Sequence, residues 1–270
     1  MASALPTTSS DAIARRFEAL RAGGRRALIP YVTAGHPDAE RSVALLQGLE
    51  AAGADIVEVG VPFSDPMADG PVIQASSQRA LDQGMSFDAT LELIARAGLG
   101  VPVVLFSYLN PILAAGDDAL RRSADAGAHG VLITDLPVGA DPERERWFGD
   151  GPLAFIRLVA PTTPTARMRE IARHGSGFVY LISRLGVTGA RDALATDLPA
   201  TIARLREATT LPICVGFGIS RPEQAATVAA LADGVAVGSA LVAAADRDID
   251  EALALARSLR TAIDDACARS

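Results

Sequence analysis

A carboxylate stands inside one of the short apolar segments of this chain. Glu58 interrupts Ile56–Val59, and Asp65 and Asp69 follow it in a segment rich in proline and glycine. Burying a charged carboxylate among apolar residues is costly, so Glu58 should either contact a cation or carry a raised pKa that suits proton transfer near neutrality. An ion pair with an arginine is the structural alternative, and we favour the functional one. Asp65 and Asp69 support the functional interpretation, because solvent exposure alone is a poor explanation for two carboxylates in a loop rich in proline and glycine.

Glycine and serine follow two apolar segments near the end of the chain. Gly216–Ser220 comes directly after the segment that begins at Ile213, and Gly238–Ser239 comes after Val235–Val237. Backbone N–H groups and a hydroxyl at a helix N-terminus bind phosphate without lysine. Each motif alone is weak evidence, because glycine is also the ordinary turn residue. Placed after the seventh and eighth expected strands, the two motifs together predict a phosphate site.

The segment Ser183–Ala190 contains two glycines and hydroxyl side chains. These features are typical of a lid that closes over a ligand. A plain surface loop is an equally good interpretation of the same residues.

All 25 basic residues are arginine, and the sequence contains no lysine. Codon usage that favours arginine accounts for the bias, but its chemical consequence holds regardless. A Schiff-base aldolase and a pyridoxal-phosphate enzyme both need a lysine amine, which guanidinium cannot replace. His36, His129 and His174 are scattered without the short spacings of a metal site, which disfavours a metal-dependent aldolase. We therefore expect chemistry without a metal or an organic cofactor.

The composition indicates which kinds of partner the chain can bind and in which compartment it is expected. A formal net charge of -7 disfavours nucleic acid, which binds to basic surfaces, and favours a small molecule or a protein. Cys214 and Cys267 are too few and too distant for a disulfide framework, and the first residues lack the pattern of a signal peptide. No apolar run reaches the roughly 20 residues of a membrane span. We therefore predict a cytoplasmic protein.

Eight short apolar segments alternate with longer segments of helical period, which is typical of βαβ units and a parallel sheet. The expected strands are Ala27–Val32, Ile56–Val59, Val103–Ser107, Val131–Thr134, Leu153–Leu158, Phe178–Leu181, Ile213–Gly216 and Val235–Val237. The expected helices include Asp38–Ala52, Asp88–Ala97, Asp117–Ala126, Thr165–His174, Leu198–Ala208 and Pro222–Leu231, and the alanine-rich segment Leu241–Ala245 is also expected to be helical. Caps are expected at Asp38 and Ser220, and terminating glycines at Gly53 and Gly127.

Eight such repeats close naturally into an α/β fold, the (β/α)8 TIM barrel. The length of 270 residues fits one domain over residues 1–270, with residues 1–10 as a tail. Asp11–Arg21 is expected to form an extra N-terminal helix that covers the barrel floor, and Ile249–Ala266 a helix that closes the chain. In such barrels the active site lies at the carboxyl ends of the strands.

Several segments resemble the tryptophan synthase α family, in family order and over nearly the whole chain. They are Leu28–Gly35, Glu58–Pro66 with Ala68–Pro71, Ala160–Pro164, Gly186–Gly189 and Gly216–Ser220. The resemblance implies an α-type lyase of tryptophan biosynthesis that cleaves indole-3-glycerol phosphate to indole and glyceraldehyde 3-phosphate without a cofactor. It also implies a β-subunit partner in an α2β2 heterotetramer.

The same resemblance assigns roles to individual residues. Glu58 is implied as the general acid/base, Asp69 as the carboxylate that accepts the indole N–H, and Tyr180 as a tyrosine close to Glu58. The implied phosphate contacts are Gly189, Gly218, Gly238 and Ser239. The implied apolar walls around indole, for which ordinary core packing is an equal explanation, are Tyr31, Phe106, Leu132 and Phe217. The implied partner-facing positions are Pro62, Asp65, Tyr108 and Asn110.

The sequence also departs from the family and leaves alternatives. His36 stands where the family more usually has aspartate, and Thr134 where proline is common. The alternatives are a free-standing lyase, an inactive regulatory subunit and a phosphosugar isomerase of the same fold. Such isomerases place carboxylates after strands one and five, whereas here Thr33 follows the first expected strand and Leu158 ends the fifth. The presence of both Glu58 and Asp69 disfavours an inactive subunit.

Overall fold

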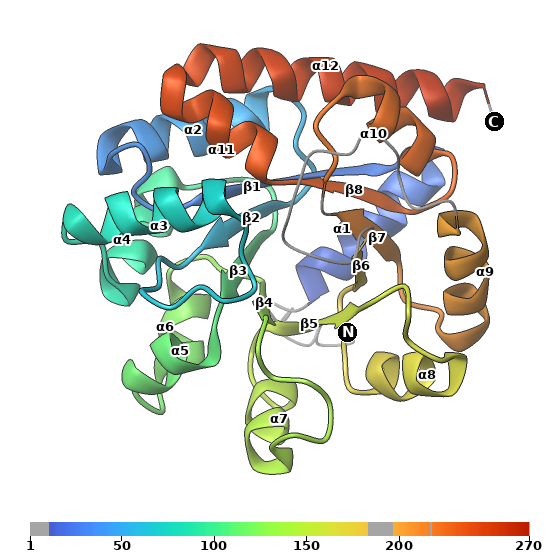
Figure 1. Ribbon diagram of the computed structural model, residues 1–270, viewed down its shortest axis with the longest axis horizontal. Helices are drawn as coiled ribbons and strands as arrows, with labels where there is room; N and C mark the ends of the chain where they lie inside the picture. The colour runs from blue at the N-terminus through green and yellow to red at the C-terminus, as the bar shows by residue number, and fades with distance from the viewer. Residues whose placement is uncertain (1–10, 183–196, 217, 270) are drawn as a thin grey trace, which may run out of the picture.

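The computed structural model of the chain describes residues 11–182, 197–216 and 218–269. Eight parallel strands form a closed barrel in chain order, and β1 pairs with β8 to complete it. The strands are β1 (Ala27–Thr33), β2 (Val57–Gly60), β3 (Val103–Ser107), β4 (Gly130–Ile133), β5 (Ala154–Val159), β6 (Val179–Ile182), β7 (Ile213–Gly216) and β8 (Gly234–Val237). The predicted TIM barrel is confirmed, and Figure 1 shows its ring of helices around the strands.

Helices connect and surround the strands, and within the described residues none is long and apolar enough to cross a membrane. They are α1 (Asp11–Ala22), α2 (Ala39–Ala51), α3 (Pro71–Asp82), α4 (Phe87–Ala97), α5 (Leu109–Ala114), α6 (Ala119–Asp125), α7 (Pro142–Gly149), α8 (Thr165–Arg173), α9 (Leu198–Ala208), α10 (Pro222–Ala229), α11 (Ser239–Arg247) and α12 (Ile249–Ala268). Asp38 caps α2 by accepting a hydrogen bond from the Arg41 N–H, as expected. The cap predicted at Ser220 is wrong by one residue, because α10 begins at Pro222 and Arg221 is its N-cap residue.

Two apolar cores lie on the two sides of the barrel wall. The outer core packs the surrounding helices against outward-facing strand residues. The inner core fills the barrel with inward-facing residues of the strands, among them Ile29, Ile56, Val104, Leu132, Ile156, Phe178 and Cys214. A barrel of this size is a packed core and no pore, so a ligand site can form only near its rim.

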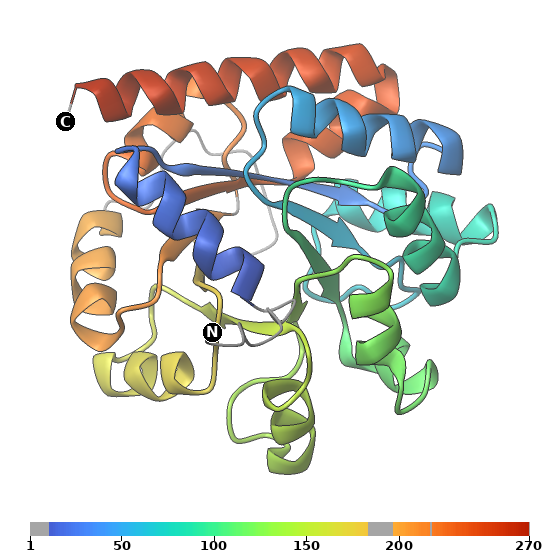
Figure 2. The same ribbon diagram turned by 180° about the vertical axis from the view of Figure 1, so that it is seen from behind.

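The extra N-terminal helix covers the amino end of the barrel, as predicted. Ile13 and Phe17 of α1 belong to the inner core, and the Phe17 ring lies 5.8 Å from the ring of Phe178. Figure 2 shows α1 across this end of the barrel. The opposite end, where the strands terminate, therefore carries the loops that contain Asp69 and Gly238.

Candidate active site

Glu58 points into the barrel from the middle of β2, in register with Tyr31 of β1. Its side chain is buried, and Oε1 has no hydrogen-bond partner among the described residues. Burial raises the pKa of Glu58 to about 8, since no solvent stabilises the charged form. The arginine ion pair that was the structural alternative is not found among the described residues. A carboxyl group with such a pKa can give and take a proton near neutral pH.

Two tyrosines flank Glu58 because two glycines leave room for their hydroxyl groups. A Cβ atom added to Gly60 would lie 2.0 Å from Tyr31 Oη, and one added to Gly216 would lie 2.0 Å from Tyr180 Oη. Both tyrosines belong to the inner core, and burial raises the pKa of each, with a smaller contribution from the charge of Glu58. Tyr180 thus belongs to the same inner core into which Glu58 points, and its role beside Glu58 stays a prediction of the family resemblance. The Tyr31 hydroxyl adds a polar group to what was predicted as an apolar wall.

Asp69 ends the loop between β2 and α3, and Tyr108 contacts it directly. Tyr108 Oη donates a hydrogen bond to Asp69 Oδ2 over 3.0 Å and accepts one from the Ala68 N–H over 2.9 Å. Partial burial raises the pKa of Asp69, while the hydrogen bond from Tyr108 opposes the rise. Burial is the main cause of the raised pKa of Tyr31, and the charge of Asp69 adds to it.

The remaining predicted walls lie in the inner core. Phe106 and Leu132 are buried, and the Phe106 ring meets the Tyr31 ring edge-on with centroids 5.3 Å apart. Phe106 occupies β3 and Leu132 the adjacent β4, paired in register. Their apolar side chains belong to the inner core of the barrel, into which Glu58 also points. Phe217 lies outside the described residues.

The predicted phosphate motif stands at the start of α11. Gly238 is the N-cap residue of this nine-residue helix, and Ser239 is its first residue and is exposed. Gly218 has a φ of 82°, which a residue with a side chain rarely adopts. Gly238 also lies beside Tyr31, because an added Cβ atom would be 3.5 Å from Tyr31 Cβ. Gly189 and the predicted lid over Ser183–Ala190 lie outside the described residues.

The predicted partner-facing residues divide into two pairs. Asp65 and Asn110 are exposed, whereas Pro62 and Tyr108 are buried in this single chain. Met67, in the same loop as Asp65, is 85% exposed and is the most exposed large apolar side chain of the described residues. The exposed pair can contact a partner directly. Tyr108 faces Asp69 instead, a contact that the sequence did not reveal because 39 residues separate the two positions.

His36 is buried beneath α11. Its Nε2 atom lies 3.7 Å from Asp246 Oδ1, and Asp246 also forms an ion pair with Arg79 of α3. Burial lowers the pKa of His36, and Arg79 adds to this, while Asp246 opposes it. His36 is therefore buried between the loop after β1 and the helix that begins at the phosphate motif, with neither ring nitrogen hydrogen-bonded among the described residues.

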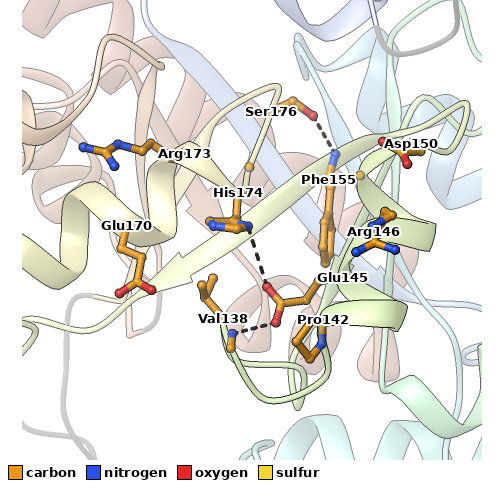
Figure 3. A pocket seen from close by; sticks show the side chains of 13 residues that line it. Val138, Pro142, Glu145, Arg146, Asp150, Phe155, Glu170, Arg173, His174 and Ser176 are labelled. Carbon is orange, nitrogen blue, oxygen red and sulfur yellow. Dashed lines mark hydrogen bonds and ion pairs between the residues drawn. The ribbon is translucent and has the colours of Figure 1, made fainter.

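A groove outside the barrel lies between α7, β5 and α8 (Figure 3). Glu145 there forms a buried ion pair with Arg157 over 2.9 Å, accepts a hydrogen bond from the Gly139 N–H over 2.6 Å and lies 4.0 Å from His174. The guanidinium of Arg157 also packs over the ring of Phe155. This groove faces the outer core and does not include Glu58 or Asp69.

A closed parallel barrel with a raised-pKa carboxyl group, a second carboxylate and a helix N-terminus at its mouth defines a TIM-barrel enzyme with acid–base chemistry. The family model described as "Tryptophan synthase alpha chain" matches residues 17–267. The chain belongs to the tryptophan synthase alpha chain family, and it is a lyase of the α type.

Individual relatives agree over most of their length. The tryptophan synthase alpha chain of Caulobacter vibrioides (strain NA1000 / CB15N) is 48% identical over 239 residues, which cover 87% of this chain and 86% of the relative. That of Desulfatibacillum aliphaticivorans is 50% identical over 232 residues, covering 84% and 87%. A structure of tryptophan synthase from Mycobacterium tuberculosis superposes with a TM-score of 0.86 at 37% identity, covering 93% of this chain and 97% of the other. Tryptophan synthase subunit alpha from Legionella pneumophila gives 0.86 at 36% identity, covering 96% and 99%.

Proposed function

We propose that this chain cleaves indole-3-glycerol phosphate to indole and glyceraldehyde 3-phosphate, with Glu58 and Asp69 as its catalytic residues. Cleavage of this substrate is the activity of the family. The observation that carries the residue assignment is the buried Glu58 carboxyl group, with a pKa raised to about 8 and one unpartnered oxygen at the barrel mouth.

The proposed reaction is a retro-aldol cleavage that moves two protons. Protonated Glu58 gives its proton to C3 of the indole ring, and the bond from C3 to the glycerol chain then breaks. The adjacent glycerol hydroxyl loses its proton as the aldehyde forms, and the Glu58 carboxylate accepts it, which restores the acid. Asp69 accepts the indole N–H and stabilises the positive charge that develops on the ring.

The phosphate of the substrate is assigned to the start of α11. Gly238 and Ser239 present backbone N–H groups, a hydroxyl and the positive end of the helix dipole there. Gly218 on the loop after β7 would complete the contact, and we extend the proposal to Gly189 and Phe217 on the family resemblance alone. Anchoring the phosphate between β7 and β8 would direct the indole ring toward Tyr31, Phe106 and Leu132.

We infer a β-subunit partner and an α2β2 heterotetramer in the cytoplasm. Support comes from the structures of tryptophan synthase from Mycobacterium tuberculosis that this chain resembles, and from exposed Asp65 and Asn110 beside the barrel mouth. Activity measured with and without a tryptophan synthase β subunit tests the pairing. A chain that forms no complex and gains no activity would be a free-standing lyase instead.

Conservative substitution of each carboxyl group tests the catalytic assignment. Glu58→Gln removes the transferable proton and Asp69→Asn removes the negative charge, so each should lower indole release by at least about 100-fold. Indole is measured after addition of indole-3-glycerol phosphate. Asp65→Asn, in the same loop as Asp69, is the control and should retain wild-type turnover in the isolated chain. Wild-type turnover in the Glu58 or Asp69 variant would refute the assignment of that residue.

A further inference from the structure

Tyr108 is fixed between the end of β3 and the start of α5, with its side chain directed toward the barrel mouth. It is the N-cap residue of α5, and only 5% of its surface is exposed. Its ring packs against the ring of Phe63 with centroids 5.1 Å apart. The Leu109 N–H that follows donates to Asp135 Oδ1 over 2.7 Å, which ties this backbone to the loop after β4. Tyr108 therefore presents its hydroxyl group from a braced position.

Two consecutive residues of the β2–α3 loop meet that hydroxyl group. The Ala68 N–H donates to Tyr108 Oη over 2.9 Å, so the phenol proton must point elsewhere. It points to Asp69 Oδ2, 3.0 Å away. The direction of the hydrogen bond is thus set by the backbone, and the phenol acts as a donor to the carboxylate.

This contact divides the roles of the two Asp69 oxygens. Oδ2 is occupied by Tyr108, while Oδ1 has no hydrogen bond from any of the described residues. The Gln74 side chain donates to the Asp69 carbonyl oxygen over 2.9 Å and restrains the backbone of the same residue. A carboxylate held in this way offers a single free oxygen to a ligand, in one orientation.

We propose that Tyr108 is a positioning residue for the reaction, which orients Asp69 through Oδ2 so that Oδ1 accepts the indole N–H. This inference rests on the proposed function. It replaces the expectation that Tyr108 serves only at a partner surface. A donor on the carboxylate also favours its charged form, the form in which Asp69 stabilises the developing positive charge.

Tyr108→Phe keeps the ring and removes the hydroxyl group. Loss of a hydrogen bond to a charged group should lower kcat for indole release by roughly 10- to 100-fold, with KM changed less than about threefold. The acid limb of the pH profile of kcat should move to higher pH, because Asp69 loses a donor that stabilises its ionised form. Ser64→Ala removes a hydroxyl group from the same loop without touching Asp69, and it is the matched control.

The outcomes separate this inference from the function on which it rests. A wild-type chain that releases no indole contradicts the proposed function itself. An active wild type, with a Tyr108→Phe variant that retains wild-type kcat or an unshifted acid limb, overturns the positioning role alone. Phe63→Leu keeps the hydroxyl group but loosens the ring, and should shift the acid limb in the same direction by less. If Tyr108→Phe melts below the assay temperature, the test rests on Phe63→Leu. An acid limb of its kcat profile at the wild-type pH would then overturn the positioning role of Tyr108.

Discussion

A carboxyl group buried as deeply as Glu58 lowers the stability of the folded chain whenever it is charged. Its oxygen Oε1 lacks a partner among the described residues, and the surrounding side chains are apolar or phenolic. In the unfolded chain the same group is solvated and ionises at its usual pKa near 4.5. Between that pH and about 8, the folded chain holds a proton that the unfolded chain has released. Stability should therefore fall as the pH rises through this window.

Glu58→Gln should remove this dependence on pH. We expect the variant to be more stable than the wild type at pH 8, by an amount on the order of a few kcal/mol, because no charge remains to be buried. At pH 4 the two proteins should melt at similar temperatures, since both side chains are neutral there. Thermal unfolding measured from pH 4 to 9 checks this.

The control is Glu18→Gln, which changes an exposed carboxylate on α1. The melting temperature of Glu18→Gln should stay close to that of the wild type at every pH. A Glu58→Gln variant that is equally or less stable than wild type at pH 8 would mean that Glu58 is solvated or paired in solution. The mechanism would then lose its proton donor.

Sequence reasoning identified Glu58 because its surroundings in the chain are themselves informative. A charged residue within Ile56–Val59 is anomalous whatever the rest of the fold does. The role of Tyr108 and the position of His36 had no such signal. Tyr108 contacts Asp69 from 39 residues away, and His36 meets Asp246, which lies near the other end of the chain. Pairing of β2 with β3 brings the first pair together, and pairing of β1 with β8, which closes the barrel, brings the second together.

At the scale of elements, strands were predicted to within one or two residues because short apolar segments between turn residues mark them clearly. Three helices were not predicted, namely α3, α5 and α7. Helix α5 has six residues with Pro111 in its first turn, and α7 begins at Pro142 and is rich in charged residues. Such helices lack the long apolar period that sequence patterns detect, and packing on the barrel stabilises them instead.

A buried aspartate joins three elements at the amino end of the barrel. Asp55, just before β2, accepts hydrogen bonds from the Leu28 N–H over 3.0 Å and from Arg260 of α12 over 2.8 Å. Its other oxygen lies 3.2 Å from Arg16 of α1. A single carboxylate thus connects β1, α12 and α1 at the amino end of the barrel.

Asp55→Ala should lower the free energy of unfolding by about 2–4 kcal/mol, since it leaves the nearly buried Arg260 without this partner and the Leu28 N–H unsatisfied. Asp264→Ala removes the half-exposed partner of the same arginine and should cost less than about 1 kcal/mol. Urea unfolding of both variants compares them. If the two variants lost the same free energy of unfolding, the buried Asp55 would contribute no more to stability than the half-exposed Asp264.

At the scale of the whole molecule, the two ends of the barrel differ in what they can contact. Asp65, Met67 and Asn110 are exposed at the end that carries Asp69, whereas α1 covers the other end. A partner that influences the reaction should therefore bind at the Asp69 end. This expectation belongs to the proposed α2β2 assembly.

Charge reversal at that end should weaken the assembly without unfolding the chain. Asp65→Arg should reduce affinity for a β subunit by at least about tenfold, because it places a new charge of opposite sign in the proposed interface. Glu18→Arg makes the same change on α1, at the far end, and should bind as the wild type does. Titration calorimetry gives both affinities. Equal affinities of the two variants for the β subunit would show that Asp65 does not lie in the interface.

Helix α1, which covers the amino end of the barrel, also determines from which side a ligand can reach the proposed site. Because Ile13 and Phe17 fill the amino end and the inner core is packed, the described residues leave the proposed site open only toward the end that carries Asp69 and Gly238. Under the proposed function, substrate and both products would pass between Gly238 and the Asp69 loop. In the proposed α2β2 assembly, a partner bound at this end would cover the opening through which the products leave.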